Sequence, residues 1–273
     1  MNQFEFLPLI TIGQYLPTDS FIHRRDARAK LLFFSGLILA ITFTTSRMGL
    51  IFGVLLALLG IVVARVSLRY ALKGLLPPLP FLIFIALLQV FFFSTTINTV
   101  VYFQWGLIHV SQAGLWAGLQ LMLRFVALIL GLSLMFFCLS TSEAITALSK
   151  ILSPLNKIGI HTMDFVMVFQ VSMRFLPLLA QSAERIAKAQ AARGAEWGVK
   201  RGNVISQVKR IIPLIVPLFL ISLRRAETMA LAMDARAYGL KNQRTSIYQL
   251  KFTPLDGLLL VIGIGLMALV ILL

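Results

Sequence analysis

The sequence is poor in acidic residues, cysteine and histidine. Its 273 residues include only 10 Asp and Glu, three histidines and one cysteine, Cys138. A single cysteine excludes an intramolecular disulfide, and its apolar surroundings favour ordinary packing. His23, His109 and His161 lie far apart, without the spacing that metal ligands show. We therefore expect no metal site in this chain.

Motifs for nucleotide binding and for secretion are also missing. No Gly-x-x-x-x-Gly-Lys-Ser/Thr loop occurs in the sequence, so any ATP that its function requires must be bound by another chain. We expect no cofactor here. The N-terminal region contains Glu5, Asp19, Asp26 and two prolines in place of a basic start followed by an apolar run, and this pattern argues against a signal peptide.

Hydrophobic residues and positive charge are abundant instead. Hydrophobic residues make up 59% of the chain, charged residues only 13%, and the mean hydropathy is +0.90, which indicates an integral membrane protein. The net charge is +15, with 15 basic and 6 acidic residues in 141–244. Such a block belongs on the cytoplasmic face, because translocation disfavours Lys and Arg. Membrane chains collect this charge without a nucleic-acid ligand, and we expect no nucleic-acid partner.

Five apolar runs predict an all-α, polytopic fold with about five transmembrane helices in the inner or plasma membrane. The distribution of basic residues places the N-terminus inside, the uncharged loop at 95–112 outside, and Arg47 alone on the outer side. Three parts follow: residues 1–140 with four spans, a cytoplasmic coupling region at 141–254, and a last span at 255–273. The predicted spans are 31–46, 49–64, 75–94, 113–138 and 255–273.

Two further apolar segments, Phe165 to Ala180 and Ile211 to Leu223, complicate the count of spans. The second is short and contains Pro213 and Pro217. If both segments crossed, residues 181–210 would lie outside with seven basic residues, against the positive-inside rule. We therefore interpret both as buried or interfacial helix. A seven-span arrangement is the alternative.

Arg124 is the one basic residue deep inside a predicted span. An intramembrane arginine is costly, and by default it indicates a functional or paired role. No acidic partner is evident in the predicted spans, so we favour a structural bond to helix carbonyls or snorkelling toward the membrane surface over a role in transport.

Two long basic segments, 172–192 and 204–237, are predicted to be helices with small residues along one face. Such stripes let helix backbones approach closely, so we expect a crossed pair of helices packed through alanine. The helix propensity of alanine explains either stripe equally well when each is taken alone. The stripe residues are Ala180, Ala183, Ala187 and Ala191 in the first segment, and Ala226, Ala230, Met233 and Ala237 in the second.

Each of these helices ends in a short arginine signature, Ala192-Arg193-Gly194 and Ala235-Arg236-Ala237. Gly194 suits the left-handed conformation that commonly ends a helix, whereas Ala237 suits it less well. An arginine at a helix end is a permanently charged fork that can bind carboxylates or carbonyls of another protein. Neutralising the helix dipole or contacting anionic lipid is an equally good reading of the residues alone.

The tips and their surroundings resemble the transmembrane T component of energy-coupling factor transporters, which import micronutrients such as vitamins or metals. The resemblance covers most of the chain, although many family members have glycine where Ala237 stands. It rests on His23-Arg24-Arg25-Asp26-Ala27-Arg28-Ala29-Lys30, on Arg174-Phe175-Leu176-Pro177 leading to Ala189-Gln190-Ala191-Ala192-Arg193-Gly194, and on Met233-Asp234-Ala235-Arg236-Ala237-Tyr238-Gly239.

This resemblance implies a non-catalytic scaffold. The two arginines would dock into two ABC-type ATPase subunits, which bind ATP and Mg, and the crossed helices would transmit the closure of the ATPases to a separate substrate-binding membrane subunit, the S component. Two other hypotheses remain. One is a membrane enzyme acting on anionic lipid, although the acids of 141–244 form no Asp-rich metal motif. The other is a self-contained channel or secondary transporter, although few carboxylates lie inside the spans.

Overall fold

The chain forms two compact units in the computed structural model, which describes residues 16, 18, 20–92, 101–105, 108–154, 162–194, 204–239 and 252–273. The first, here called the bundle unit, comprises Gly13–Thr162 and Leu250–Leu273. The second, the two-helix unit, comprises Met1–Ile12 and Met163–Gln249. The connector helix α6, described below, therefore belongs to the same unit as the apolar helices.

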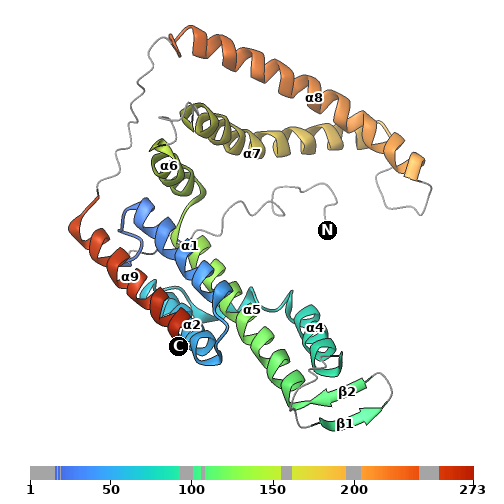
Figure 1. Ribbon diagram of the computed structural model, residues 1–273. Coiled ribbons are helices and arrows are strands. Elements are labelled where there is room, and N and C mark those ends of the chain that lie inside the picture. The colour runs from blue at the N-terminus through green and yellow to red at the C-terminus, as the bar shows by residue number, and fades with distance from the viewer. Residues whose placement is uncertain are drawn as a thin grey trace. The chain divides into compact units, whose positions relative to one another are not determined.

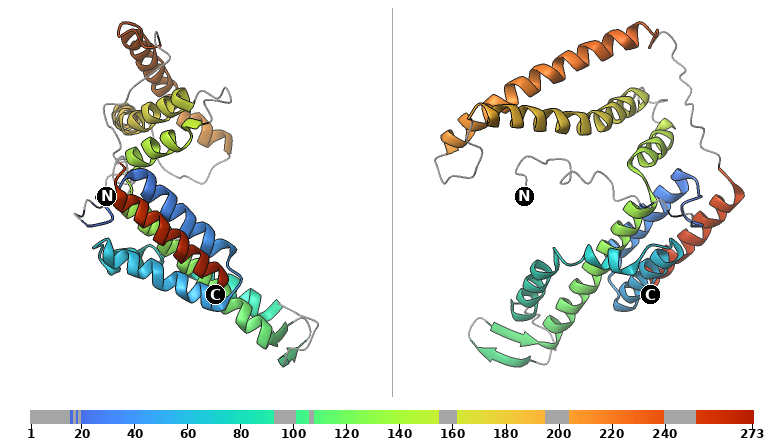
Figure 2. Two further views of the ribbon diagram at one scale, coloured as in Figure 1. Left: turned by 60° about the vertical axis from the view of Figure 1, so that its left-hand side comes forward. Right: turned by 180° about the vertical axis from the view of Figure 1, so that it is seen from behind.

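Each of the five predicted apolar runs forms a helix of the bundle unit (Figure 1). α5 packs against α1, α2 and α4, and α9 lies along α1, as Figure 2 shows from the side. A short helix α3 follows α2, and α6 follows α5 and packs on α1. The bounds are α1 Ala27–Phe43, α2 Arg47–Val63, α3 Leu68–Lys73, α4 Leu79–Phe92, α5 Gln112–Cys138, α6 Thr141–Ile151 and α9 Pro254–Leu272.

The core of the bundle unit lies between α1, α2 and α5. Phe34, Ile61, Leu130 and Leu134 are almost completely buried there. The start of α2 also approaches the end of α9 very closely, because a Cβ atom on Gly49 would lie 2.2 Å from the carbonyl oxygen of Val270. Only glycine fits at that contact, which brings two helix backbones together.

Arg47 differs from its predicted place in the connection between the first two spans. It is the first residue of α2, and its guanidinium carbon lies 4.2 Å from the centre of the Trp116 ring on α5. The connection itself is Thr44 to Ser46. Stacking on an aromatic face stabilises a cation without an acidic partner, so the Trp116 ring supports Arg47 at the start of α2.

A small β-hairpin occupies part of the region that the sequence indicated to be loop. β1 (Val101–Trp105) pairs antiparallel with β2 (Ile108–Ser111), and the hairpin packs against α4 and the start of α5. The side chain of Ser111 then caps α5 by accepting a hydrogen bond from the Gly114 amide at 3.0 Å. The hairpin thus leads directly into the central helix of the bundle.

The two-helix unit contains the helices α7 (Thr162–Ala192) and α8 (Val204–Asp234), each 31 residues long. α7 joins the apolar segment and the basic segment into one continuous helix through Pro177, so it begins well before the predicted start at residue 172. In the part of the chain that the structure describes, three helices are long and apolar enough to cross a membrane, namely α5, α9 and Asp164–Ala192 of α7. α2 and α4 are apolar but shorter.

Candidate docking sites at two helix tips

The first tip is the C-terminus of α7. Gly194 has a φ of +84°. Its amide donates to the carbonyl of Ala191 at 2.9 Å, and the Arg193 amide donates to the carbonyl of Gln190 at 3.1 Å. A positive-φ glycine with these bonds ends a helix, and it makes Arg193 the C-cap residue. The predicted role of Gly194 in ending the helix is therefore confirmed.

The second tip, at the end of α8, closes in the same way without a glycine. Ala237 has a φ of +58°. The Ala237 amide donates to the carbonyl of Asp234 at 2.8 Å and the Tyr238 amide to that of Met233 at 3.0 Å, which is the Schellman pattern. Arg236 is therefore the C-cap residue of α8. An L-residue in this conformation costs about 1–2 kcal/mol, so Ala237 ends the helix at an energetic cost.

The two arginines thus occupy the same position of the same local structure. Arg193 and Arg236 are both exposed, and each adds a permanent positive charge at the negative end of its helix dipole. The residues beside them are small, which leaves each guanidinium accessible to a partner surface. The flanking residues Ala192, Gly194, Ala235 and Ala237 are exposed as well.

α7 and α8 run antiparallel, so the tips lie at opposite ends of the two-helix unit (Figure 1). The Tyr238 hydroxyl donates to the Met167 sulfur at 2.6 Å, which places the tip of α8 beside the start of α7. Arg193 lies 26 residues beyond Met167 along α7. At about 1.5 Å per helical residue, the two tips are separated by roughly 35–40 Å.

Arg225 on α8 makes the described hydrogen bonds between the middles of the two helices. Its guanidinium donates to Ser182 Oγ at 3.0 Å and to the carbonyl of Leu178 at 3.3 Å. Ser182 is buried beneath it. Sequence reasoning missed this residue, although its position next to the stripe residue Ala226 was a signal that it faces the other helix.

The alanine stripes occupy different environments. On α7, Ala180 and Ala187 are buried, and Ala183 and Ala191 are half-buried. On α8, Ala226 and Ala230 are exposed and Met233 is half-buried. These three α8 residues line a groove of about 750 Å³ together with α7 residues from Met167 to Leu179. In the described part of the unit, the α8 stripe therefore faces the α7 segment that precedes the α7 stripe.

Large apolar side chains are exposed along much of α7 and α8. Exposed apolar patches of this extent mark a contact with membrane or with another protein. We therefore expect these side chains of both helices to be covered by membrane or by another protein. The exposed side chains include Phe165, Val168, Phe169, Leu176, Ile215, Phe219, Leu220 and Leu231.

Arg124 makes the predicted bond to a helix carbonyl in the bundle unit. Its Nη2 atom donates at 2.5 Å to the carbonyl of Thr44, the C-cap residue of α1. Gln120, one helical turn earlier on α5, donates to the carbonyl of Thr45 at 2.7 Å. The structural interpretation of Arg124 is thus confirmed, because it satisfies a backbone oxygen that the end of α1 leaves unpaired.

Cofactor binding has little support in the described side chains. Across residues 20–92, 108–154 and the other described segments, no group of three or more His, Cys, Asp and Glu side chains could hold a metal ion. Of the three histidines, His23 makes described hydrogen bonds, to Ser20 Oγ at 2.6 Å and to the Phe137 carbonyl at 3.2 Å, and His161 lies outside the described residues.

Comparison with known proteins decides the family. A family described as "Cobalt transport protein" matches residues 18–247. The energy-coupling factor transporter transmembrane protein EcfT of Brevibacillus brevis is 39% identical over 258 residues, covering 93% of this chain and 94% of the relative. The chain belongs to this EcfT family. EcfT of Clostridium kluyveri is 37% identical over 247 residues and covers 90% of both chains, and that of Staphylococcus aureus is 33% identical with the same coverage.

Membership in the EcfT family establishes the class of function. The chain is a transmembrane component of an energy-coupling factor transporter, a membrane protein that acts within a larger complex and is itself non-catalytic. It carries no cofactor, and the ATPases of the transporter are separate partners. This outcome favours the scaffold over the lipid enzyme and over the self-contained channel or secondary transporter.

Proposed function

We propose that Arg193 and Arg236 are the two docking residues for two ABC-type ATPase subunits, and that α7 and α8 couple these subunits to the membrane. The observation that carries the proposal is the equivalence of the tips. Each is an exposed arginine at the C-cap of a long helix, followed by a residue with positive φ. A guanidinium held in this way is preorganised for carboxylates and carbonyls in a groove of the partner.

The separation of the tips supports two docking sites instead of one. With the helices antiparallel and about 35–40 Å between the tips, the two guanidinium groups cannot enter a single pocket. Two ATPase subunits that approach each other on binding ATP would move the tips and change the angle between α7 and α8. Among the described residues, Arg225 and Tyr238 make the hydrogen bonds between α7 and α8 that would hold this angle.

The exposed apolar side chains of α7 and α8 support a further membrane partner, the substrate-binding S component. Their size and number suit an interface that is buried against another apolar protein surface or against lipid. In this arrangement the N-terminus and residues 141–254 face the cytoplasm. The seven basic residues of 181–210 favour this topology, even though α7 is long enough to cross a membrane.

Charge reversal at the tips tests the proposal. Arg193→Glu and Arg236→Glu should each weaken copurification of the ATPase subunits from the native host, and the double variant should abolish it. The reason is that the carboxylates and carbonyls of the partner groove accept hydrogen bonds from a guanidinium but repel a carboxylate. Membrane insertion should remain intact. Arg185→Glu on α7 and Arg224→Glu on α8, exposed arginines away from the tips, are the controls. Normal copurification with the double variant would refute the docking role.

A further inference from the structure

The basic segment 23–30 at the start of α1 is not used by the docking proposal, yet it contacts α6 and the start of α9, the two places where the chain leaves and re-enters the bundle unit. The chain leaves the bundle unit after α6, which precedes α7, and it returns at Leu250, just before α9. Both α6 and the first turn of α9 place an acidic side chain against the segment 23–30. All of these contacts lie inside the bundle unit.

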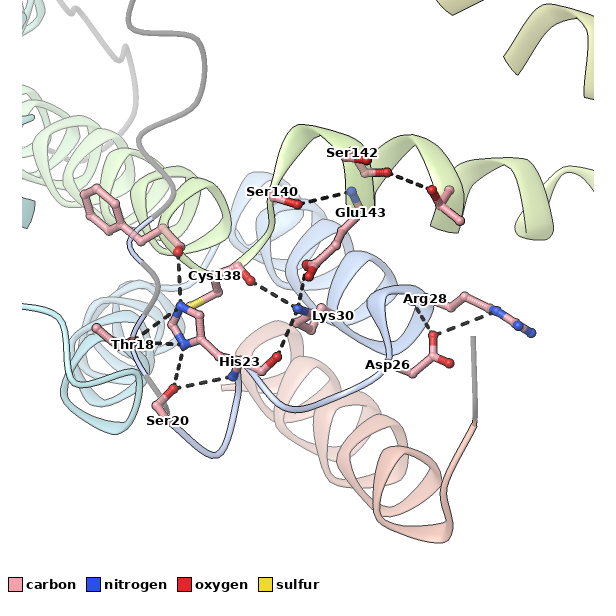
Figure 3. A network of polar contacts seen from close by, with 12 residues as sticks. Thr18, Ser20, His23, Asp26, Arg28, Lys30, Cys138, Ser140, Ser142 and Glu143 are labelled. Carbon is pink, nitrogen blue, oxygen red and sulfur yellow. Dashed lines mark hydrogen bonds and ion pairs between the residues drawn. The ribbon is translucent and has the colours of Figure 1, made fainter. Parts of the chain in front are cut away.

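Lys30 joins α1 to the start of α6, the helix after which the chain leaves the bundle unit (Figure 3). Its Nζ donates to Glu143 Oε2 on α6 at 2.8 Å, to the Cys138 carbonyl at the end of α5 at 3.3 Å, and to the His23 carbonyl at 3.4 Å. One ammonium group therefore joins the start of α1, the last carbonyl of α5 and the first turn of α6. A cation at the C-terminus of α5 is favoured by the helix dipole as well.

The burial of the ion pair is strongly asymmetric. The Lys30 side chain is 1% exposed, whereas that of Glu143 is 38% exposed. A buried ammonium is expensive unless a carboxylate compensates it, while a half-exposed carboxylate can be solvated by water. Release of α6 from the bundle would therefore leave Lys30 without its counter-charge, and this cost keeps α6 in place.

Asp256 joins the start of α9, where the chain re-enters the bundle unit, to the start of α1. This residue is 1% exposed in the first turn of α9, and its Oδ1 accepts a hydrogen bond from the Asp26 amide at 3.2 Å. The Arg25 Nη1 atom lies 4.0 Å from the same oxygen. The other carboxylate oxygen accepts from the Thr253 amide at 2.8 Å, which completes a capping box at the start of α9.

The two anchors share a sequence pattern. Ser140-Thr141-Ser142-Glu143 and Thr253-Pro254-Leu255-Asp256 both place a hydroxyl residue at the N-cap and an acid three residues later. In both helices the acid reaches the segment at the start of α1. The N-terminal ends of α1, α6 and α9 thus meet at this segment. Its basic residues and the Asp26 amide bind the two acids, Glu143 and Asp256.

We propose that residues 23–30 form a junction that holds α6 and the start of α9 against the bundle unit. The chain runs to and from the two-helix unit through these two segments, and Lys30, Glu143 and Asp256 are the positioning residues. A junction of this kind prevents α6 and the start of α9 from yielding when α7 and α8 move, so that the movement reaches the transmembrane helices. This consequence rests on the proposed coupling function. The anchoring itself does not, and it can be measured on the purified full chain.

The asymmetric burial gives the anchor a signature that a general loss of stability would not produce. Glu143→Gln removes the exposed partner and leaves a buried ammonium, so it should release α6 more than Lys30→Met, which leaves a solvated carboxylate. The double variant Lys30→Met with Glu143→Gln has no unpaired charge. It should therefore hold α6 better than Glu143→Gln alone.

Hydrogen–deuterium exchange of the full chain in detergent measures this directly. Glu143→Gln should accelerate exchange of the α6 amides by about tenfold or more, and the double variant should recover a large part of that change. Asp256→Asn should accelerate the first turn of α9 in the same way and leave α6 unchanged. The control is Glu184→Gln, which breaks the exposed pair with Lys188 and should change neither region.

Three outcomes would overturn the junction: unchanged exchange in Glu143→Gln, a uniform increase across all helices, or no recovery in the double variant. The same variants separate this proposal from the docking proposal. Glu143→Gln and Asp256→Asn should still copurify with the ATPases and support ATP hydrolysis. Uptake by cells, measured with a panel of labelled B vitamins, cobalt and nickel, should fall at least about fivefold, which is the lower end of typical coupling between two sites. Normal uptake in the combined Glu143→Gln and Asp256→Asn variant would refute the coupling role alone.

Discussion

The bundle unit and the two-helix unit bury their side chains in very different ways. In the bundle unit, large residues such as Phe34, Leu50 and Ile61 are almost completely inaccessible. In the described parts of α7 and α8, the buried side chains are Val166, Ala180, Ser182 and Ala187, while large apolar side chains are exposed along both helices. The longest helices of the chain therefore have the least core of their own.

The contacts between helices differ in kind as well. Gly49 brings the backbones of α2 and α9 together, whereas α7 and α8 are joined in the described contacts by the long side chains of Arg225 and Tyr238. Backbone packing fixes one geometry, because interiors are dense and resist deformation. Contacts between long side chains tolerate a change of angle. The bundle unit thus resists movement, and the two-helix unit is suited to it.

Matched leucines test this contrast most strongly. Leu50 is 0% exposed on α2, and Leu220 is 51% exposed on α8. Leu50→Ala should lower the free energy of unfolding by about 2–4 kcal/mol, mainly through the cavity that it leaves, and Leu220→Ala should change it by less than about 0.5 kcal/mol. Thermal unfolding of both variants in detergent measures the difference. Equal losses would mean that α8 is packed as tightly as the bundle.

Matched glycines sharpen the contrast within the bundle unit. A Cβ atom on Gly49 would meet the Val270 carbonyl, whereas one on Gly265 of α9 would have nothing within 4 Å. Gly49→Ala should therefore destabilise the fold by about 1–3 kcal/mol, while Gly265→Ala should be neutral or stabilise it by up to about 1 kcal/mol. In the same detergent, the unfolding midpoint should fall for Gly49→Ala and should stay the same or rise for Gly265→Ala. An unchanged midpoint for Gly49→Ala would contradict the close approach of α2 and α9.

Arg225 tests how α7 and α8 are joined. Arg225→Met removes two hydrogen bonds of a half-exposed guanidinium, for which we expect a local loss of about 1 kcal/mol. Exchange of the α7 amides near Ser182 should accelerate about fivefold, with the bundle helices unchanged. Arg224→Met, at the exposed neighbouring position, is the control. Faster exchange throughout the bundle unit would mean that the two units are not independent.

The smallest expected effects distinguish the two tips. Ala237→Gly relieves a left-handed alanine and should stabilise α8 by about 0.5 kcal/mol after the entropic cost of glycine, whereas Gly194→Ala should destabilise α7 by about 1 kcal/mol. Thermal unfolding followed by circular dichroism detects both shifts. Copurification of the ATPases should be unaffected by either change, since both arginines remain. If both variants raised or both lowered the unfolding midpoint, the shared capping geometry would be contradicted.

The helices were largely predictable because apolar runs inside a membrane leave few alternatives for the backbone. The five runs correspond to α1, α2, α4, α5 and α9. The hairpin β1–β2 was missed, since a short polar-apolar stretch between spans reads as loop when its pairing partner is unknown. α6 was missed as a separate helix, because its residues were assigned without a boundary to the start of the predicted coupling region at 141–254.

The candidate docking site was predictable only as a list of residues. Arg193 and Arg236 stand out in the sequence, and Gly194 signals the end of α7. The end of α8 did not follow from residue preferences, because Ala237 adopts a backbone conformation that alanine usually avoids. Arg225 was overlooked, because a basic residue in a basic helix normally faces solvent.

The sequence by itself determined that this is a polytopic helical membrane protein with a basic region at 141–244 and two arginine tips. Those properties depend on composition, run length and local capping preferences, all of which are readable along the chain. Only the tertiary structure decided that the two arginines lie at opposite ends of antiparallel helices, and that Lys30 is buried against Glu143. Both depend on which distant residues meet, and a charge that looks solvated in the sequence is buried once three helices close around it.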